Sequence, residues 1–287
     1  MTSRRPPRPP LGGPPGWPAA CKLRRASSQP PPSPLGAASV PARETPGLPP
    51  EPLNIPHGGL ELAGLLHCPA QTPRAGVVIA HGLYSSMRSE KLTRLAQALA
   101  RAGYLALQFD ASGCGESPGQ VRRTTLTSRA QEFLAAARAL SGLEPGIPLA
   151  YLGSSLGGTA ALVAAGQVPP LCTVCWSTPV DLGALAVRLA GQAHPPELPD
   201  MPGDIPRHHL EALLARSSRV LFIHGELDEV VPVAQAHRAH ELAAPPKGLL
   251  VLPGADHRLS RLEDQERALA RTLAWLECLT PRGRIPA

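Results

Sequence analysis

The sequence contains no run of 18 apolar residues, so it predicts no segment that crosses a membrane. The N-terminus is basic but lacks a continuous apolar stretch, which argues against a secretory signal peptide. Cysteine is also scarce. Six cysteines are scattered over 287 residues, unlike the dense disulfide framework of a small secreted domain. Together these absences predict a cytoplasmic protein.

Acidic residues are missing from positions 1–43, which hold seven Lys and Arg. Taking these seven from the 28 basic residues leaves 21 against 22 acidic ones, so the formal charge of +6 belongs to the N-terminus. The rest of the chain therefore gives no reason to expect a nucleic-acid partner.

Residues 1–50 also hold 15 of the 36 prolines and few large apolar side chains, which predicts a disordered tail before a domain at 51–287. An inert extension is the favoured interpretation of the tail. A partner-binding tail, a transit-like peptide and a nucleic-acid arm stay open. After Met1 the next methionine is Met87, inside the predicted domain, so a shorter product would need a different start codon.

From residue 53 onward, short apolar runs alternate with segments of helical periodicity. This alternation predicts an α/β fold: a mostly parallel sheet of about eight strands with helices on both faces and an antiparallel hairpin at its start. Residues 178–218 break the rhythm, and an insertion of that length predicts a lid or binding element. The strands are expected within 53–67 (the hairpin), 76–81, 104–110, 148–153, 171–177, 219–224 and 248–253, and the main helices at 89–103, 126–142, from 156, at about 233–243 and at 260–279.

Two adjacent serines follow the predicted strand at 148–153. A sharp strand-to-helix turn that exposes a serine needs glycine two places to either side of it, because larger side chains would collide there. Ser155 has Gly153 and Gly157 at these places, whereas Ser154 has leucines. The sequence therefore predicts Ser155 as a nucleophile, with Ser154 as a spacer.

A serine hydroxyl becomes a strong nucleophile when a base removes its proton and a carboxylate orients that base. The strand at 219–224 is followed by Glu226, Asp228 and Glu229, and the strand at 248–253 is followed by His257. Sites of open α/β sheets lie at the carboxyl ends of their strands, so these groups should converge on Ser155.

These motifs make the sequence resemble the α/β-hydrolase superfamily, within it the serine aminopeptidase-like and cinnamoyl or feruloyl esterase-like proteins. The resemblance covers about 53–279 and implies the order Ser155, Asp228, His257 for a catalytic triad. It also implies that the backbone N–H groups of Leu83 and Leu156 form the oxyanion hole. The matching segments are HGLYSS (81–86), DASGCGESPG (110–119), GSSLGG (153–158), HGELDEVVP (224–232) and GADH (254–257).

Asp228 matches the family position of the acid, and Asp256 ranks second because it is adjacent to His257 in the chain. Among the other polar residues, His81 is interpreted as a structural histidine that bonds its loop. The D-x-x-G-x-G-x-S loop is interpreted as structural too, and the remaining histidines on polar helices as solvated surface. The residues named by the loop motif are Asp110, Gly113, Gly115 and Ser117. The histidines on polar helices are His208, His209, His237 and His240.

Cys172 and Cys175 form a C-x-x-C pair, a spacing that occurs in redox and metal sites. Here the surrounding LCTVCWS predicts a buried strand, on which positions i and i+3 point to opposite faces. The two sulfurs could then share neither a metal nor a disulfide. No other residues complete a metal site with His237 and His240, so the sequence predicts no metal and no cofactor.

The expected function is that of a serine hydrolase that cleaves a small-molecule carboxylic ester through an acyl-enzyme. Thioester and small-amide or peptide hydrolysis stay open, as does a non-catalytic binding protein with this fold. The natural substrate and the oligomeric state are left open by the sequence.

Overall fold

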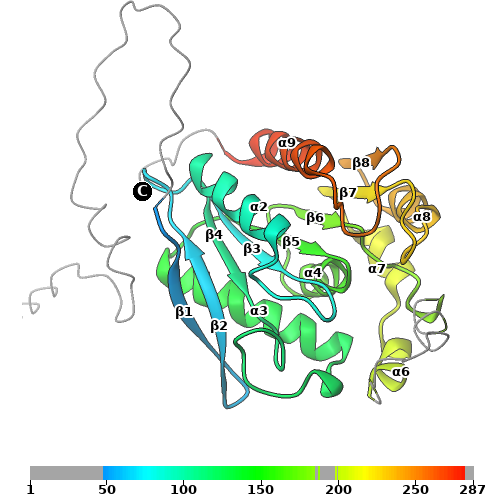
Figure 1. The fold of residues 1–287 in the computed structure, drawn as a ribbon, viewed down its shortest axis with the longest axis horizontal. Coiled ribbons are helices and arrows are strands. Elements are labelled where there is room, and N and C mark those ends of the chain that lie inside the picture. Colours follow the sequence, from blue (N-terminus) through cyan, green and yellow to red (C-terminus); the bar gives the residue numbers. More distant parts are fainter. Residues whose placement is uncertain (1–47, 185–186, 188–197, 199, 282–287) are drawn as a thin grey trace, which may run out of the picture.

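The computed structural model describes residues 48–184, 187, 198 and 200–281. The predicted tail, apart from its last three positions, and the middle of the predicted 178–218 insertion therefore lie outside the described residues. The described chain is built on one eight-stranded sheet of order β1-β2-β4-β3-β5-β6-β7-β8 (Figure 1). In it β2 runs antiparallel to both neighbours, and all other pairings are parallel. The predicted α/β fold class is confirmed.

Each predicted strand is present, with ends shifted by at most two residues. The hairpin turns at Gly58 and Gly59, whose φ angles of 56° and 82° lie in the left-handed region that glycine adopts at little cost. The strands are β1 (Glu51–His57), β2 (Leu60–His67), β3 (Gly76–Ala80), β4 (Leu105–Phe109), β5 (Leu149–Ser154), β6 (Thr173–Trp176), β7 (Val220–Gly225) and β8 (Lys247–Leu252).

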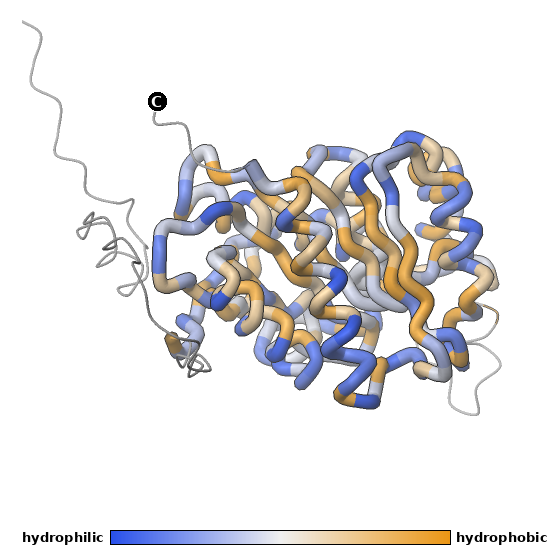
Figure 2. Tube along the Cα trace, turned by 90° about the horizontal axis from the view of Figure 1, so that it is seen from above, coloured by the Kyte–Doolittle hydropathy of each residue, from blue (hydrophilic) through white to orange (hydrophobic). Residues whose placement is uncertain are grey.

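Helices cover both faces of the sheet, as the apolar strand runs predicted. One face packs against α2 (Glu90–Arg101) and α9 (Leu262–Leu279). The other packs against α3 (Leu126–Leu143), α4 (Leu156–Gln167) and α8 (Ala234–Leu242). Figure 2 shows the resulting pattern, with apolar strands through the middle and hydrophilic turns on the outside.

Short helices follow in the described part of the 178–218 insertion: α6 (Met201–Asp204), η3 (Ile205–Arg207) and α7 (Leu210–Arg216). A further short helix, η2 (Val121–Arg123), precedes α3. Leu182, Met201 and Leu210 of the insertion pack against Leu126 and Leu156, at the first turns of α3 and α4. The insertion therefore lies beside the start of α4. Its role as a lid stays a prediction.

The C-x-x-C pair has the geometry expected of a strand. Cys172 packs in the core on the α2 and α9 face, whereas Cys175 packs on the α4 and α8 face. Both thiols are free, and burial raises the pKa of each to about 12. The structural interpretation of this pair is confirmed.

No helix among the described residues is long and apolar enough to cross a bilayer.

Candidate active site

Ser155 occupies a sharp turn between β5 and α4. Its backbone has φ 55° and ψ −128°, a conformation that side-chain-bearing residues rarely adopt. Two hydrogen bonds hold it there: the Ser155 N–H donates to the Trp176 carbonyl, and the Ser155 carbonyl accepts from the Gly158 N–H, each at 2.8 Å. The strained turn is therefore fixed by the neighbouring strand and by the first turn of the helix.

The glycines around this turn are required by close backbone contacts. A Cβ atom at Gly153 would overlap the Gly157 carbonyl group, and one at Gly157 would lie 2.5 Å from the carbonyl oxygens of Ala80 and His81. These contacts confirm the steric reason for glycine two places to either side of Ser155. They also bring the end of β3 against the start of α4.

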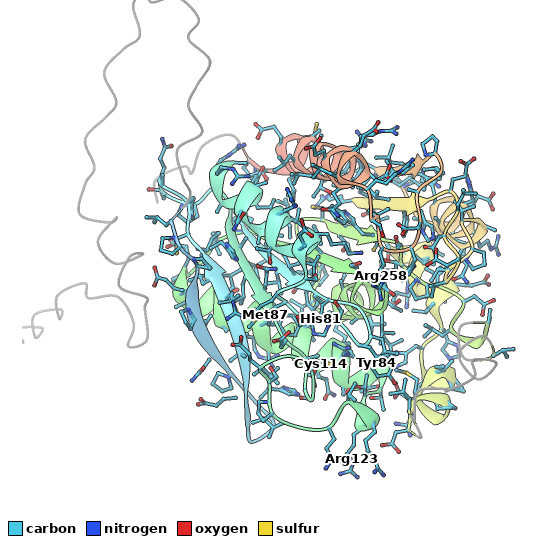
Figure 3. The ribbon with its side chains drawn as sticks, in the orientation of Figure 1. His81, Tyr84, Met87, Cys114, Arg123 and Arg258 are labelled. Atoms are coloured by element: carbon cyan, nitrogen blue, oxygen red, sulfur yellow. The ribbon has the colours of Figure 1, made fainter. Side chains whose placement is uncertain are left out.

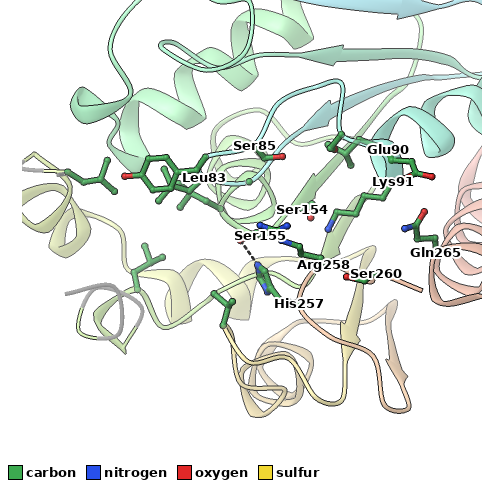
Figure 4. A pocket seen from close by; sticks show the side chains of 18 of the residues that line it. Leu83, Ser85, Glu90, Lys91, Ser154, Ser155, His257, Arg258, Ser260 and Gln265 are labelled. Carbon is green, nitrogen blue, oxygen red and sulfur yellow. Dashed lines mark hydrogen bonds between the residues drawn. The ribbon is translucent and has the colours of Figure 1, made fainter. Parts of the chain in front are cut away.

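The structure brings the three predicted triad residues together. The Ser155 Oγ lies 3.1 Å from His257 Nε2, and His257 Nδ1 lies 2.8 Å and 3.0 Å from the two carboxylate oxygens of Asp228 (Figure 4). An ionised carboxylate only accepts hydrogen bonds, so the proton of the neutral imidazole resides on Nδ1. Nε2 is then free to accept a proton from the Ser155 hydroxyl.

Asp228 is held as a carboxylate by several donors. Its Oδ1 accepts from the backbone N–H groups of Val230 and Val231 at 2.9 Å and 2.6 Å. Its Oδ2 lies 3.1 Å from His224 Nε2. Burial by itself would raise the pKa of Asp228, but the hydrogen bonds from His224, His257 and Val231 outweigh it and hold this pKa well below its usual value.

The other carboxylates near this loop pair elsewhere. Asp256, the second candidate, accepts from the Ser260 N–H and hydroxyl at 2.8 Å and 2.5 Å. Glu226 accepts from a backbone N–H of the loop after β8 at 2.9 Å. Glu229 accepts from the backbone N–H of His257 at 3.1 Å and so tethers the loop that carries the imidazole. Sequence reasoning missed this tether and the contact of His224, although both residues lie in the HGELDEVVP segment, because the segment does not reveal which atoms its side chains contact.

The two predicted oxyanion donors lie beside Ser155 in the same pocket. Leu156 is the first residue of α4, where backbone N–H groups lack partners within the helix. Gly82, which precedes Leu83, lies so close that a Cβ atom there would be 3.0 Å from Ser155 Cβ. Among the described residues, no acceptor receives a hydrogen bond from the N–H of Leu83 or Leu156. Both are available to a bound molecule.

Two side-chain donors hold the Gly82 carbonyl and so orient the Gly82–Leu83 peptide. His81 Nδ1 lies 2.6 Å from the Gly82 carbonyl oxygen, and the buried Arg129 Nη2 lies 3.4 Å from it. His81 Nε2 accepts from the Ala111 N–H at 3.1 Å, which places the imidazole proton on Nδ1. Because the carbonyl and the Leu83 N–H belong to one planar peptide and point in opposite directions, anchoring the first orients the second.

The structural interpretation of His81 and of the Asp110 loop is confirmed. Burial and the nearby Arg129 lower the pKa of His81 to about 3, so it stays neutral. Asp110 accepts from the Met87 and Glu116 N–H groups at 2.6 Å and 2.8 Å, and the Ser117 hydroxyl donates to the Asp110 carbonyl at 2.6 Å. Figure 3 labels His81, Met87 and Cys114 in this region.

His208 corrects one prediction. It was expected on the solvated surface, but its side chain is only 13% exposed and bonds the Asp204 carboxylate at 3.2 Å and the Thr127 hydroxyl at 3.0 Å. These contacts join the segment after α6 to the first turn of α3. The prediction was wrong because the polar residues around His208 indicated an exposed segment. In the folded chain, Asp204 and Thr127 cover one side of the His208 ring.

A pocket of about 710 Å³ opens over Ser155 and His257. Leu182, Met201 and Ile205 form an apolar part of its wall, and Lys91 and Arg258 add charged side chains (Figure 4). Within the part of the chain that the structure describes, no group of three or more His, Cys, Asp or Glu is placed to hold a metal ion.

Known proteins share this architecture. Residues 71–195 match the family described as serine aminopeptidase, S33. The esterase domain of a Rhodothermus marinus protein superposes with a TM-score of 0.67 at 25% identity, over 82% of this chain and 100% of that chain. Est1E from Butyrivibrio proteoclasticus, solved with ferulic acid bound, gives 0.66 at 19% identity over 78% and 99%. The chain has the fold of an α/β-hydrolase.

Among curated relatives, this chain is 34% identical over 183 residues to an uncharacterized protein of Mycobacterium tuberculosis. The aligned region is 62% of this chain and 60% of that relative, so the chain spans less than two thirds of its length. The family match at 71–195 includes Ser155 but ends before Asp228 and His257. Asp228 and His257 are placed at the site by their contacts with each other and with Ser155.

Replacing Gly153 by alanine should destabilise the protein by at least about 2 kcal/mol, because the new methyl group meets a backbone carbonyl that cannot move aside. Gly142→Ala in α3 is the matched control. Nothing lies within 4 Å of a Cβ atom there, and helix propensity predicts a gain of about 0.5–1 kcal/mol. Urea unfolding measures both. Equal stability of the two variants would contradict the steric argument.

Proposed function

We propose that this protein is a serine hydrolase that cleaves a carboxylic ester of a small molecule through a covalent acyl-enzyme. The observation that carries the proposal is the continuous chain of contacts from Ser155 Oγ through His257 to Asp228, at 3.1 Å and 2.8 Å. Esterases among the superposed structures favour an ester over other acyl substrates.

In the proposed reaction, His257 Nε2 takes the hydroxyl proton while Ser155 Oγ attacks the acyl carbon. Asp228, ionised and buried, stabilises the imidazolium that forms. The tetrahedral intermediate then collapses, the bond to the leaving alkoxide breaks, and His257 delivers its proton to that oxygen. Water repeats the sequence on the acyl-enzyme, releasing the acid and restoring Ser155.

The Leu83 and Leu156 N–H groups would hold the oxyanion of both tetrahedral intermediates. Such donors act strongly when they are oriented before the reaction, since no reorganisation is needed as charge develops. His81 and Arg129 supply this orientation for Leu83 through the Gly82 carbonyl, and the sharp turn between β5 and α4 supplies it for Leu156.

Amide or peptide hydrolysis is the second candidate, because the matched family is described as serine aminopeptidase and uses the same kind of nucleophile. Thioester hydrolysis needs the same groups as ester hydrolysis. A non-catalytic binding protein would not need the hydroxyl, imidazole and carboxylate to lie in hydrogen-bonding contact. The predicted cytoplasmic location, tail and lid stay predictions.

Ser155→Ala should abolish labelling by a fluorophosphonate probe and lower ester hydrolysis by at least about 10³-fold, because the probe and the ester both need the Oγ nucleophile. Ser154→Ala is the control, one residue away and buried at the end of β5. It should label like the wild type. Labelling retained in Ser155→Ala would refute the assignment of the nucleophile.

Asp228→Asn should lower kcat by about 10⁴-fold, because an amide in place of the carboxylate favours the wrong imidazole tautomer. Asp256→Asn is the matched control, since Asp256 bonds Ser260 and does not bond the ring. Its activity should stay of the same order as that of the wild type. Circular dichroism checks that both variants fold, and loss of activity in Asp256→Asn alone would overturn the choice of acid.

A further inference from the structure

Two cationic side chains line the pocket beside the nucleophile without a partner. Lys91 extends from the first turn of α2, and Arg258 directly follows His257 in the chain. Figure 4 shows both side chains reaching into the pocket near Ser155. Among the described residues, neither forms a salt bridge or a hydrogen bond.

The nearby carboxylates are already committed to other groups. Glu90, on the same pocket wall, bonds Arg94 at 2.8 Å. Asp256 accepts two hydrogen bonds from Ser260, and Asp228 is bonded to His257 and its other donors. Their charges act on Lys91 only from a distance and supply no hydrogen bond to its ammonium group.

Lys91 is half-buried, so its ammonium loses part of its hydration without a hydrogen bond from the protein to replace it. Burial lowers the pKa of its ammonium to about 8, with the Asp256 and Asp228 carboxylates opposing that effect and Arg258 adding to it. The pair thus carries two costs, the desolvation of Lys91 and its repulsion by Arg258. An anion between the two would relieve both.

We propose that the substrate carries an anionic group, a carboxylate or a phosphate, which Lys91 and Arg258 bind beside the scissile bond. This inference rests on the proposed function and names the substrate class: an acyl compound with one charged end. The Lys91 ammonium supplies a point charge, and the Arg258 guanidinium supplies a planar fork that fits either anion. Apolar residues such as Leu182, Met201 and Ile205 would contact the uncharged remainder.

Binding can be measured without turnover in Ser155→Ala protein. The probes are monomethyl adipate, methyl 5-phosphonopentanoate and methyl hexanoate, which are methyl esters of similar length ending in a carboxylate, a phosphonate and a methyl group. In ligand-observed NMR titrations, at least one anionic ester should bind about tenfold or more tightly than methyl hexanoate, as expected for a charged hydrogen bond. The anionic ester that binds more tightly shows whether the natural group is a carboxylate or a phosphate.

Adding Lys91→Met to Ser155→Ala should remove most of this tenfold preference, because the stem of the side chain is kept and the charge is lost. Lys247→Met is the matched control for net charge: Lys247 lies on β8, outside the pocket wall, with its Nζ 3.0 Å from the Glu241 carbonyl. It should keep the preference. Arg258→Met tests the second cation and should reduce the preference as well.

Equal affinity for charged and neutral esters, or a preference that survives Lys91→Met, would overturn the inference. Neither result depends on catalysis, so they are distinct from failure of the proposed function, which the Ser155→Ala labelling experiment reports. With active protein, the ratio of kcat/KM for monomethyl adipate to that for methyl hexanoate should fall about tenfold in Lys91→Met and stay constant in Lys247→Met.

Discussion

The site depends on one close approach of backbone to backbone, at the turn from β5 into α4. Gly157 touches the carbonyl oxygens of Ala80 and His81, and Ser155 is held at φ 55° by a hydrogen bond to β6. The ends of β3, β5 and β6 are therefore in contact at this turn. The position of the Ser155 hydroxyl relative to the Gly82–Leu83 peptide is set by main-chain contacts, which vary less than contacts between long side chains.

Two buried carboxylates show how the surroundings decide a role. Burial raises the pKa of Asp110, and the Glu116 and Met87 N–H groups oppose this only in part. Burial also opposes the charge of Asp228, yet two imidazoles and backbone donors outweigh it and lower its pKa. A carboxylate that stabilises a protonated histidine must stay ionised, which a lowered pKa ensures. A carboxylate that only accepts hydrogen bonds from a loop does not depend on a lowered pKa.

Much of the architecture followed from local patterns. Uninterrupted apolar runs predicted strands buried on both faces, and the period of two placed Cys172 and Cys175 on opposite faces. The glycines around Ser155 distinguished it from Ser154, because steric exclusion acts over two residues of chain and is visible in the sequence. The packing of the insertion and the contacts of His208 were not predicted, since they depend on contacts with α3.

The sequence by itself determined the strand order along the chain, the strained turn and the candidate residues at the strand ends, because each of these depends on neighbours within a few positions. The family resemblance ranked Asp228 first among the four nearby carboxylates, but only the tertiary structure showed that it meets His257, since Glu226, Glu229 and Asp256 bond other groups. The tertiary structure alone placed Lys91 and Arg258 in one pocket. Residues 167 positions apart converge there because the sheet brings the ends of distant strands to one edge.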